Sequence, residues 1–256
     1  MFVHYRTQGL ILKKEDRGEA DQLFTIYTRD FGKLEILGKA IRKISSKLRS
    51  GIEIFYLSEI EFIQGKTHKT LTDAILVEKF RNLGKSLKRL AIAYKISEVL
   101  DNLVKGQEPD EKIWQLLNET FEKLDNPRIL NTKCQILYYY FFWDLLSILG
   151  YQPELYQCAL CQKKLGYPQG PEKLYFSSKE GGIICQVCSQ KIKTKKELTP
   201  EIIKILRIIL KKDWGTLLKL KIEAKYLKEL EDVSKNYFLL IVDEAEASSS
   251  ASILIN

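Results

Sequence analysis

Four of the five cysteines constrain the fold of this chain more than any other feature. They form two pairs, Cys158 with Cys161 and Cys185 with Cys188, in the pattern C-x2-C-x23-C-x2-C. Two residues between ligands allow each pair to chelate one ion in a tight turn while neighbouring amides donate to the sulfurs. A site of four thiolates leaves no open position for water or substrate, so it stabilises a fold and activates no nucleophile. The pattern predicts one structural Zn²⁺ site, with four reduced cysteines or a redox pair as the alternative.

The start of the chain, MFVHYRTQGLIL, lacks the basic residues and long apolar core of a secretory signal. No stretch reaches the roughly 18 apolar residues that a membrane span requires. We therefore expect a cytoplasmic protein with no membrane partner. That compartment is reducing, which favours thiolates over cystines and directs the two pairs toward a metal. Cys134 stands apart and is expected to be a small buried residue on a helix.

The first 80 or so residues have the pattern of a small β-barrel. They contain five short runs rich in Ile, Leu, Phe, Tyr and Thr, separated by turns that contain Gly and Asp. A basic, serine-containing stretch, GKAIRKISSKLRSG, separates the third run from the fourth. An insertion at that point of a five-stranded barrel is the arrangement of the OB-fold. The predicted strands are residues 9–12, 23–28, 33–37, 52–63 and 70–77.

From about residue 79 the apolar residues recur with the period of a helix. Breaks at residues 106–109, 126–127 and 150–153 separate three helices, and a fourth begins with Pro200. A last helix is expected over residues 224–240. The apolar faces predicted for the first three helices are Leu87, Leu90, Ala91, Tyr94 and Leu103; Ile113, Leu116, Leu117, Phe121 and Leu124; and Leu137, Phe141, Leu145 and Leu149.

These patterns predict an α+β multidomain protein. A five-stranded OB-fold barrel occupies residues 1–80, and an all-α C-terminal domain occupies residues 81–242, with an inserted zinc hook of four cysteines at residues 158–188. The hairpin-like stretch LYFSSKEGGIIC would return the second cysteine pair onto the first. The aromatic run YYYFFW, residues 138–143, is expected to pack in the helical core, with an apolar groove for a partner peptide as the alternative. The acidic and serine-rich tail, residues 243–256, is expected to be flexible.

The formal net charge of +8 favours a polyanionic partner, either nucleic acid or an anionic membrane surface. Basic residues gather in residues 33–49, here called the basic segment. Between barrel strands such a cluster supplies phosphate contacts that do not read base sequence, and Tyr27, Phe31 and Tyr56 nearby would stack on single-stranded bases. An ordinary solvated loop is the alternative. The basic residues are Lys33, Lys39, Arg42, Lys43, Lys47 and Arg49, against one acid, Glu35.

Catalytic apparatus is not evident in the sequence. The only two histidines, His4 and His68, lie far apart and outside any metalloprotease or deaminase motif. Phosphate-binding glycine loops and a nucleophile-elbow motif do not occur. The carboxylates Glu59 and Glu61 alternate with apolar residues in a strand, as on a solvated sheet face. We therefore expect a protein that is not an enzyme and has no small-molecule substrate.

Taken together, these motifs resemble the RecO family of recombination mediators. The resemblance begins at YRTQGLILKKEDRGEADQLFTIYTRDFGKLEILGKAIRKISSKLRSGIE, continues at LLSILGYQPELYQCALC, and ends at the second cysteine pair in SKEGGIICQVC. It covers nearly all of the chain up to about residue 240. The barrel alone would be weakly specific, whereas barrel, helices and this cysteine pattern in this order are strongly specific.

The resemblance implies a DNA repair and recombination mediator of the RecFOR pathway, cytoplasmic and nucleoid-associated. It implies binding of single- and double-stranded DNA, annealing of complementary strands, and loading of RecA, with RecR, onto DNA coated with single-strand-binding protein (SSB). A zinc-containing OB-fold factor for RNA or the ribosome is the alternative, and a metal-dependent nuclease would need clustered carboxylates. The matching positions are Gly32, Lys33, Lys39, Arg42, Lys43, Lys47 and Arg49 for DNA, and Cys158, Cys161, Cys185 and Cys188 for zinc.

A partner with an acidic and apolar tail, as the resemblance implies for SSB, would need a groove with a basic rim and an apolar floor. The helix that begins at Pro200 offers both kinds of side chain. We expect the rim to be formed by Lys204, Arg207 and Lys211, beside Ile203 and Leu210.

Overall fold

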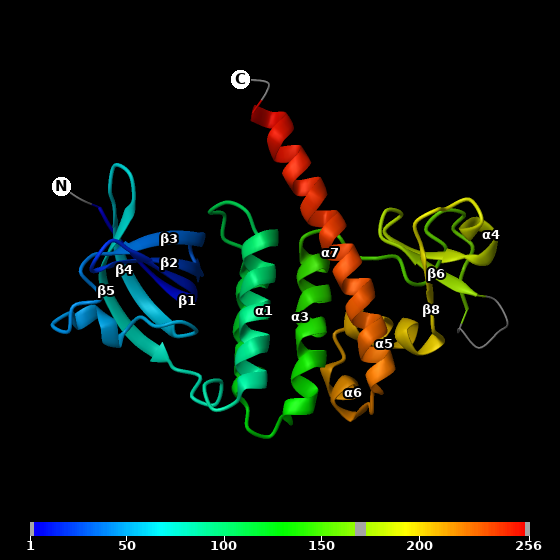
Figure 1. The fold of residues 1–256 in the computed structure, drawn as a ribbon, viewed down its shortest axis with the longest axis horizontal. Coiled ribbons are helices and arrows are strands. Elements are labelled where there is room, and N and C mark those ends of the chain that lie inside the picture. Colours follow the sequence, from blue (N-terminus) through cyan, green and yellow to red (C-terminus); the bar gives the residue numbers. More distant parts are fainter. Residues whose placement is uncertain (1–2, 167–172, 254–256) are drawn as a thin grey trace. The chain divides into compact units, whose positions relative to one another are not determined.

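Five strands at the start of the chain close into a barrel in this computed structural model, which describes residues 3–166 and 173–253, with side chains for residues 3–130, 132–166 and 173–244 (Figure 1). Their order is β1-β2-β3-β5-β4, and all neighbours are antiparallel except the parallel pair β3 and β5. A short 3-10 helix, η1 (Lys47–Ser50), lies between β3 and β4. The predicted OB-fold arrangement is confirmed. The strands are β1 (His4–Arg17), β2 (Asp21–Thr28), β3 (Gly32–Gly38), β4 (Leu57–Gln64) and β5 (Lys69–Glu78).

Alternate residues of each strand fill the barrel. In β4, Ile60 and Phe62 are buried, while the intervening Glu59 and Glu61 form ion pairs with β1. This is the period-two pattern expected of a strand with one face in a core. The barrel core also contains Ile11, Phe24, Ile26, Leu34, Ile36, Ile41, Ile52, Leu71 and Ala74.

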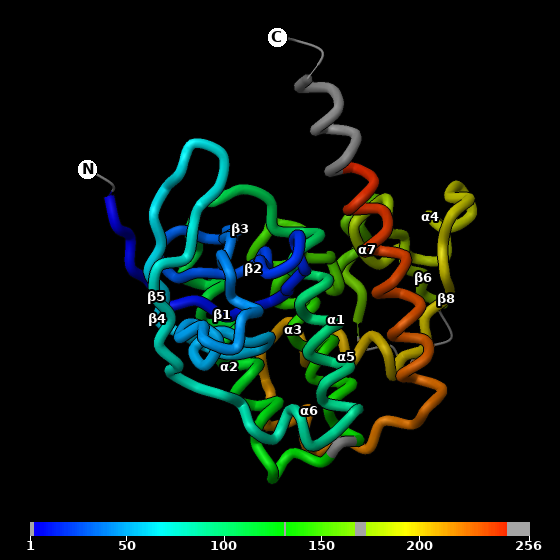
Figure 2. The backbone as a smooth tube through the Cα atoms, turned by 60° about the vertical axis from the view of Figure 1, so that its left-hand side comes forward, coloured from blue at the N-terminus to red at the C-terminus, as the bar shows by residue number. Residues whose placement is uncertain are grey.

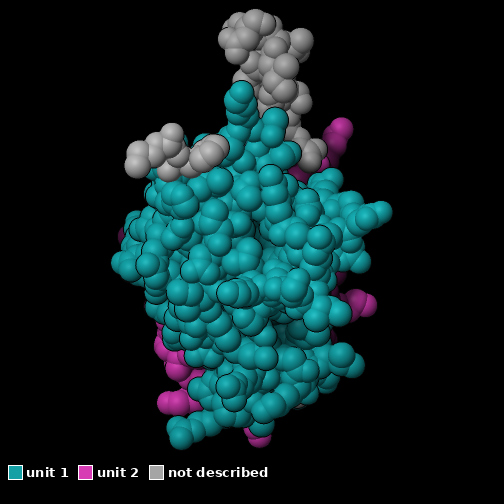
Figure 3. Space-filling model, turned by 90° about the vertical axis from the view of Figure 1, so that its left-hand side faces the viewer, with its two compact units in different colours: residues 1–135 teal, residues 136–256 magenta. Residues whose placement is uncertain are grey.

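Two helices, α1 (Leu87–Leu103) and α2 (Glu111–Asp125), complete the first of two compact units, Met1–Gln135. Figure 2 traces the chain from β5 into α1, and this unit is the teal body in Figure 3. The apolar face predicted for α2 is confirmed, because all five of its residues are buried. The face predicted for α1 is wrong: Leu87 is 85% exposed and Tyr94 48% exposed, and the helix buries Ile92, Ile96 and Leu100 instead.

A buried arginine explains the orientation of α1. Arg89 is 5% exposed, and its guanidinium donates to the backbone carbonyls of Leu124, Asn126 and Ile129 at and after the end of α2. Terminal helix carbonyls lack intrahelical partners, so an arginine fork on the neighbouring helix satisfies them. The period of the apolar residues alone does not predict that a charged residue lies on the buried face.

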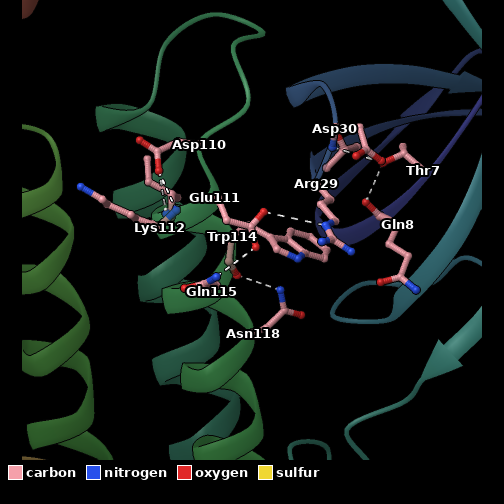
Figure 4. Close-up of polar contacts among 12 residues, drawn as sticks. Thr7, Gln8, Arg29, Asp30, Asp110, Glu111, Lys112, Trp114, Gln115 and Asn118 are labelled. Atoms are coloured by element: carbon pink, nitrogen blue, oxygen red, sulfur yellow. Dashed lines mark hydrogen bonds and ion pairs between the residues drawn. The ribbon is translucent and has the colours of Figure 1, made fainter.

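Polar contacts fasten the barrel to these helices. The Nζ of Lys33 on β3 lies 2.9 Å from Oδ1 of Asp101 on α1. Arg29 pairs with Glu111 at 3.8 Å, as Figure 4 shows. Asp110 caps α2 by accepting from the backbone N–H groups of its first turn, as Figure 4 shows. Gly32 approaches the loop before α2 so closely that a Cβ there would lie 2.4 Å from the carbonyl oxygen of Glu108.

The second unit, Ile136–Asn256, combines helices with a small sheet of strand order β7-β6-β8. The predicted hairpin is confirmed as β6 and β7, and β8 adds a strand that was not expected. A 3-10 turn, η2 (Asn131–Lys133), precedes α3, which crosses the boundary between the units. The elements are α3 (Cys134–Ile148), β6 (Leu174–Ser177), β7 (Gly182–Cys185), α4 (Gln186–Ser189), β8 (Lys196–Leu198), α5 (Pro200–Leu210), α6 (Trp214–Lys219) and α7 (Ala224–Ile253).

The aromatic run of α3 packs in the core of the second unit, as predicted. Its residues 139–143 are all buried, and Trp143 stacks on Tyr237 of α7 with ring centroids 5.4 Å apart. The Nε1 of Trp143 donates to the hydroxyl of Ser234, also on α7, at 3.1 Å. Cys134 is buried at the start of α3, as expected.

The last helix is longer than predicted, since α7 continues past residue 240 to Ile253. The predicted flexible tail, residues 243–256, therefore overlaps this helix, and its last three residues lie outside the described part of the chain. Within the described residues, no helix has the length and apolar character needed to cross a membrane.

Candidate metal centre and nucleic-acid interface

The four paired cysteines meet at one point of the second unit. Their Sγ atoms all lie within 4.8 Å of one another, and we call this group the cysteine cluster. Cys158 and Cys161 lie in the turn that follows α3, whereas Cys185 ends β7 and Cys188 lies on α4. The hairpin of β6 and β7 therefore returns the second pair to the first, as the sequence predicts.

Backbone hydrogen bonds shape the first cysteine turn. The backbone N–H of Cys158 donates to the carbonyl oxygen of Lys163, and that of Gln162 donates to the carbonyl oxygen of Cys158, both at 2.9 Å. The N–H of Ala159 donates to the carbonyl oxygen of Ile183 on β7. Gln162 adopts φ +59°, a left-handed conformation that costs a side-chain-bearing residue more than glycine. Main-chain contacts thus hold the turn on the hairpin without the help of a metal ion.

The electrostatics of the cluster favour a bound cation. Burial raises the pKa of the Cys158 thiol, but hydrogen bonds from the backbone N–H groups of Cys161, Cys185 and Leu160 outweigh it and bring the pKa down to about 6. The side chains of Cys161 and then Cys185 raise the pKa of Cys188 to about 12. Backbone amides therefore stabilise the thiolate of Cys158. Deprotonating the other cysteines of the cluster beside it requires a cation to offset the repulsion between thiolates.

The donor set and its spacing fit one tetrahedral Zn²⁺. Four thiolates at the usual Zn–S length of about 2.3 Å lie about 3.8 Å from one another. The Sγ atoms of Cys161 and Cys185 are 3.9 Å apart. Cys158 and Cys185 are buried, while Cys161 is exposed, so the cluster lies at the edge of the small sheet. That the ion is zinc stays a prediction.

The basic segment, residues 33–49, spans most of β3, the loop that follows it and most of η1. Five of its basic side chains are exposed: Lys39, Arg42, Lys43, Lys47 and Arg49. Arg42 pairs with Asp16 of β1 at 3.3 Å, which holds the start of the loop against the barrel. Ile44 in the same loop is 95% exposed. The loop therefore presents positive charge to solvent, as phosphate contacts require.

Two residues predicted to contact DNA are engaged elsewhere in the fold. The Lys33 side chain is 16% exposed and contacts Asp101, and Gly32 packs against Glu108. Neither acidic partner could be predicted from sequence, because each lies some 70 residues from its contact and carries no local signal. A DNA contact by Gly32 or Lys33 stays a prediction, alongside their observed role in joining barrel and helices.

The aromatic side chains near the basic segment are mostly core residues. Tyr27 is fully buried, with its hydroxyl 3.4 Å from the carbonyl oxygen of Asp110, so its predicted stacking on bases is wrong. Burial raises the pKa of Tyr27 to about 12. Phe31 and Tyr56 are partly buried against the barrel core. Tyr27 lies on the face of β2 opposite to the barrel-core residues Phe24 and Ile26, and the residues just before α2 cover it.

The groove predicted on α5 has a counterpart in a cavity of about 390 Å³. Lys204, Arg207 and Lys211 line it as expected, but Ile203 is fully buried, and Leu165 and Ile208 supply the apolar lining instead. Tyr156 also lines the cavity, and the guanidinium of Arg207 lies 4.7 Å from the centroid of its ring. Arg207 also donates to the carbonyl oxygen of Leu155 at 2.6 Å, so this arginine is part of the fold.

Comparisons with known proteins agree with this architecture. Residues 1–80 match the family described as "Recombination protein O N terminal", and residues 84–249 match "Recombination protein O C terminal". A protein of Dehalococcoides mccartyi named DNA repair protein RecO is 34% identical over 89% of this chain and 86% of its own length. A protein of the same name from Moorella thermoacetica is 30% identical over 93% of this chain and 86% of its own length. Another, from Caldanaerobacter subterraneus subsp. tengcongensis, is 28% identical over 91% of this chain and 90% of its own length. The chain belongs to the RecO family.

Proposed function

We propose that this protein is a DNA repair and recombination mediator that binds single- and double-stranded DNA and anneals complementary strands. Membership of the RecO family supports the role in repair and recombination. The observation that carries the proposal for DNA is the set of five exposed basic side chains in the connection between β3 and β4 of an OB-fold barrel: Lys39, Arg42, Lys43, Lys47 and Arg49.

Annealing needs charge neutralisation and no covalent chemistry. Two DNA strands repel each other through their phosphates, and a protein that contacts both backbones lowers that repulsion for any base sequence. We therefore propose no catalytic turnover and no small-molecule substrate. The cysteine cluster would hold Zn²⁺ as a structural ion that fixes the second unit.

The proposal includes the partners RecR, SSB and, indirectly, RecA. For SSB we propose the cavity beside α5, where Lys204 and Lys211 would meet the acidic residues of a tail peptide and Leu165 and Ile208 its apolar ones. Reversing the charge of Lys204 and Lys211 together should reduce tail-peptide affinity. Arg207 is left intact in that variant because its hydrogen bonds hold the fold. Unchanged affinity would remove the cavity from the proposal.

The test of the central proposal is annealing of two complementary oligonucleotides coated with SSB, without ATP, over a series of salt concentrations. We expect acceleration that fades as salt rises, because released counterions drive the binding. Replacing Arg42, Lys43, Lys47 and Arg49 by alanine should remove most of the acceleration. The matched control replaces four exposed lysines elsewhere: Lys88, Lys105, Lys112 and Lys228.

Two results would count against the proposal. Equal loss in the control variant would mean that total charge, and not the basic segment, determines binding. A preference for RNA over DNA of the same sequence would favour the RNA- or ribosome-binding alternative.

A further inference from the structure

A cavity of about 540 Å³ lies between the barrel and α1, within the first unit. Strand β1 contributes Leu12, Lys13 and Lys14 to its lining, and α1 contributes Tyr94, Ser97 and Asn102. The cavity is large enough for a nucleotide, and its walls mix apolar, aromatic and polar groups, as small-ligand sites do. None of its lining residues belongs to the cysteine cluster or to the cavity beside α5.

Ser97 gives this cavity an unused polar group. The residue is 6% exposed, and among the described residues its buried hydroxyl oxygen has no hydrogen-bond partner. A serine inside a helix ordinarily donates to the carbonyl one turn earlier, and a buried polar group without a partner costs stability. The Ser97 hydroxyl is therefore available to a ligand that brings its own donor or acceptor.

Tyr94 supplies an aromatic surface beside that hydroxyl. Its side chain is half-exposed, and the ring of Phe55 meets it in an edge-on contact with centroids 4.9 Å apart. The contact with a buried neighbour restricts the Tyr94 ring while leaving part of it accessible. A restricted, accessible aromatic ring is the usual surface on which single-stranded bases stack.

The remaining polar groups of the lining include both donors and acceptors. The Lys13 amine pairs with Glu15, and Lys14 pairs with Glu53, so the excess positive charge at this edge is small. Glu98 supplies a carboxylate and Asn102 an amide. Such a lining suits the edge of a base, which carries both donors and acceptors, better than a bare phosphate.

An ion pair links the basic segment to β1, the strand that lines the cavity. Arg42 of that segment pairs with Asp16, which follows Lys14 by two residues on the same strand. A DNA strand whose phosphates contact the basic segment would therefore reach the cavity within a short distance. We propose that the cavity binds one unstacked base of single-stranded DNA, held by stacking on Tyr94 and a hydrogen bond to Ser97. This inference rests on the proposed DNA binding by the basic segment.

The test compares a single-stranded oligonucleotide with an abasic strand of the same length, which carries the same phosphate charge. The protein should bind the strand with bases about tenfold more tightly, a ratio typical of one stacked base. Tyr94→Leu and Ser97→Ala should each lose most of this preference while keeping the affinity for the abasic strand. Ser97→Ala should melt at the same temperature as the native protein or higher, because it removes an unsatisfied hydroxyl.

Matched controls are Tyr151→Leu, an exposed tyrosine outside the cavity, and Ser147→Ala, a helical serine whose hydroxyl already donates to Trp143. Both should keep the full preference for the strand with bases. Equal binding of the two strands by the native protein, or a preference that survives in both cavity variants, would overturn the base site. If neither strand bound, the proposed function would fail and the base site with it.

Discussion

The Lys33 amine on β3 donates to Asp101 on α1 twice, at 2.7 Å to the main-chain carbonyl and 2.9 Å to the carboxylate. Asp101 lies in the last turn of α1, where unpaired carbonyls and the helix dipole favour a cation. One lysine thus joins the barrel to the helices and also completes a helix end. Its position in the basic segment gives it a structural role beside any contact with DNA.

Replacing Lys33 by methionine should therefore destabilise the first unit by about 1 kcal/mol, the net value of such a hydrogen-bonded contact. The free energy of unfolding in urea measures this loss. Lys39→Met is the control, because Lys39 is exposed and belongs to the same segment. Equal stability of the two variants would contradict the structural role of Lys33.

Arg89 should be among the least replaceable residues of the first unit. Arg89→Met leaves buried backbone carbonyls at the end of α2 without their donor, and each unsatisfied group costs about 1–3 kcal/mol. Arg89→Lys should not restore stability, because an ammonium cannot reproduce the planar fork of a guanidinium. Thermal melting of both variants beside Lys88→Met, an exposed neighbour, tests this. A full rescue by lysine would show that charge alone is required.

Binding of Zn²⁺ to the metal-free protein should release fewer than four protons at pH 7.5. All four thiols bind as thiolates, but a Cys158 pKa near 6 means that this one is already deprotonated at that pH. Calorimetry in buffers of different ionisation enthalpy measures the number released. Release of four protons would place the Cys158 pKa well above 7.5.

Loss of the metal should destabilise the second unit and leave the barrel folded. Cys158→Ser removes one ligand, and hydrogen exchange should then rise in residues 136–253 but remain slow in the barrel strands.

The free energy of unfolding of the metal-free protein should increase between pH 6 and pH 9. A pKa lowered from 9.0 to about 6 favours the folded state above pH 9, and this contribution is lost as the pH falls through 6.

Glycine at residue 162 should stabilise the turn that contains Cys158 and Cys161. Gln162→Gly relieves a left-handed conformation and should stabilise the second unit by about 0.5–1 kcal/mol. Gln190→Gly is the matched control, because Gln190 has φ −63° and gains nothing from glycine. Thermal melting with excess zinc compares the two. Destabilisation by Gln162→Gly would mean that its side chain contributes more than its backbone costs.

Patterns that repeat along the chain could be predicted from sequence, and contacts between distant residues could not. The barrel strands, the face of α2 and the meeting of the cysteine pairs follow from alternation, helical period and ligand spacing. The face of α1 was mispredicted because its orientation depends on Arg89, whose partners lie 35 or more residues away. Tyr27 was mispredicted because an aromatic residue in a strand has the same local signal whether it stacks on a ligand or on the core.

The parallel pairing of β3 with β5 involves only Ile36 with Lys69 and Leu37 with Thr70. Local opening costs least where a ladder is shortest, so amide protons at this junction should exchange with solvent sooner than those of the longer antiparallel ladders. The exposed lysines and arginines come directly after these residues in the sequence. A ligand that binds those side chains would therefore also restrain the local opening of this ladder. Occupancy of the loop could then be read from slower deuterium uptake at those amides of β3 and β5 that face one another, and not at the amides of β3 that pair with β2.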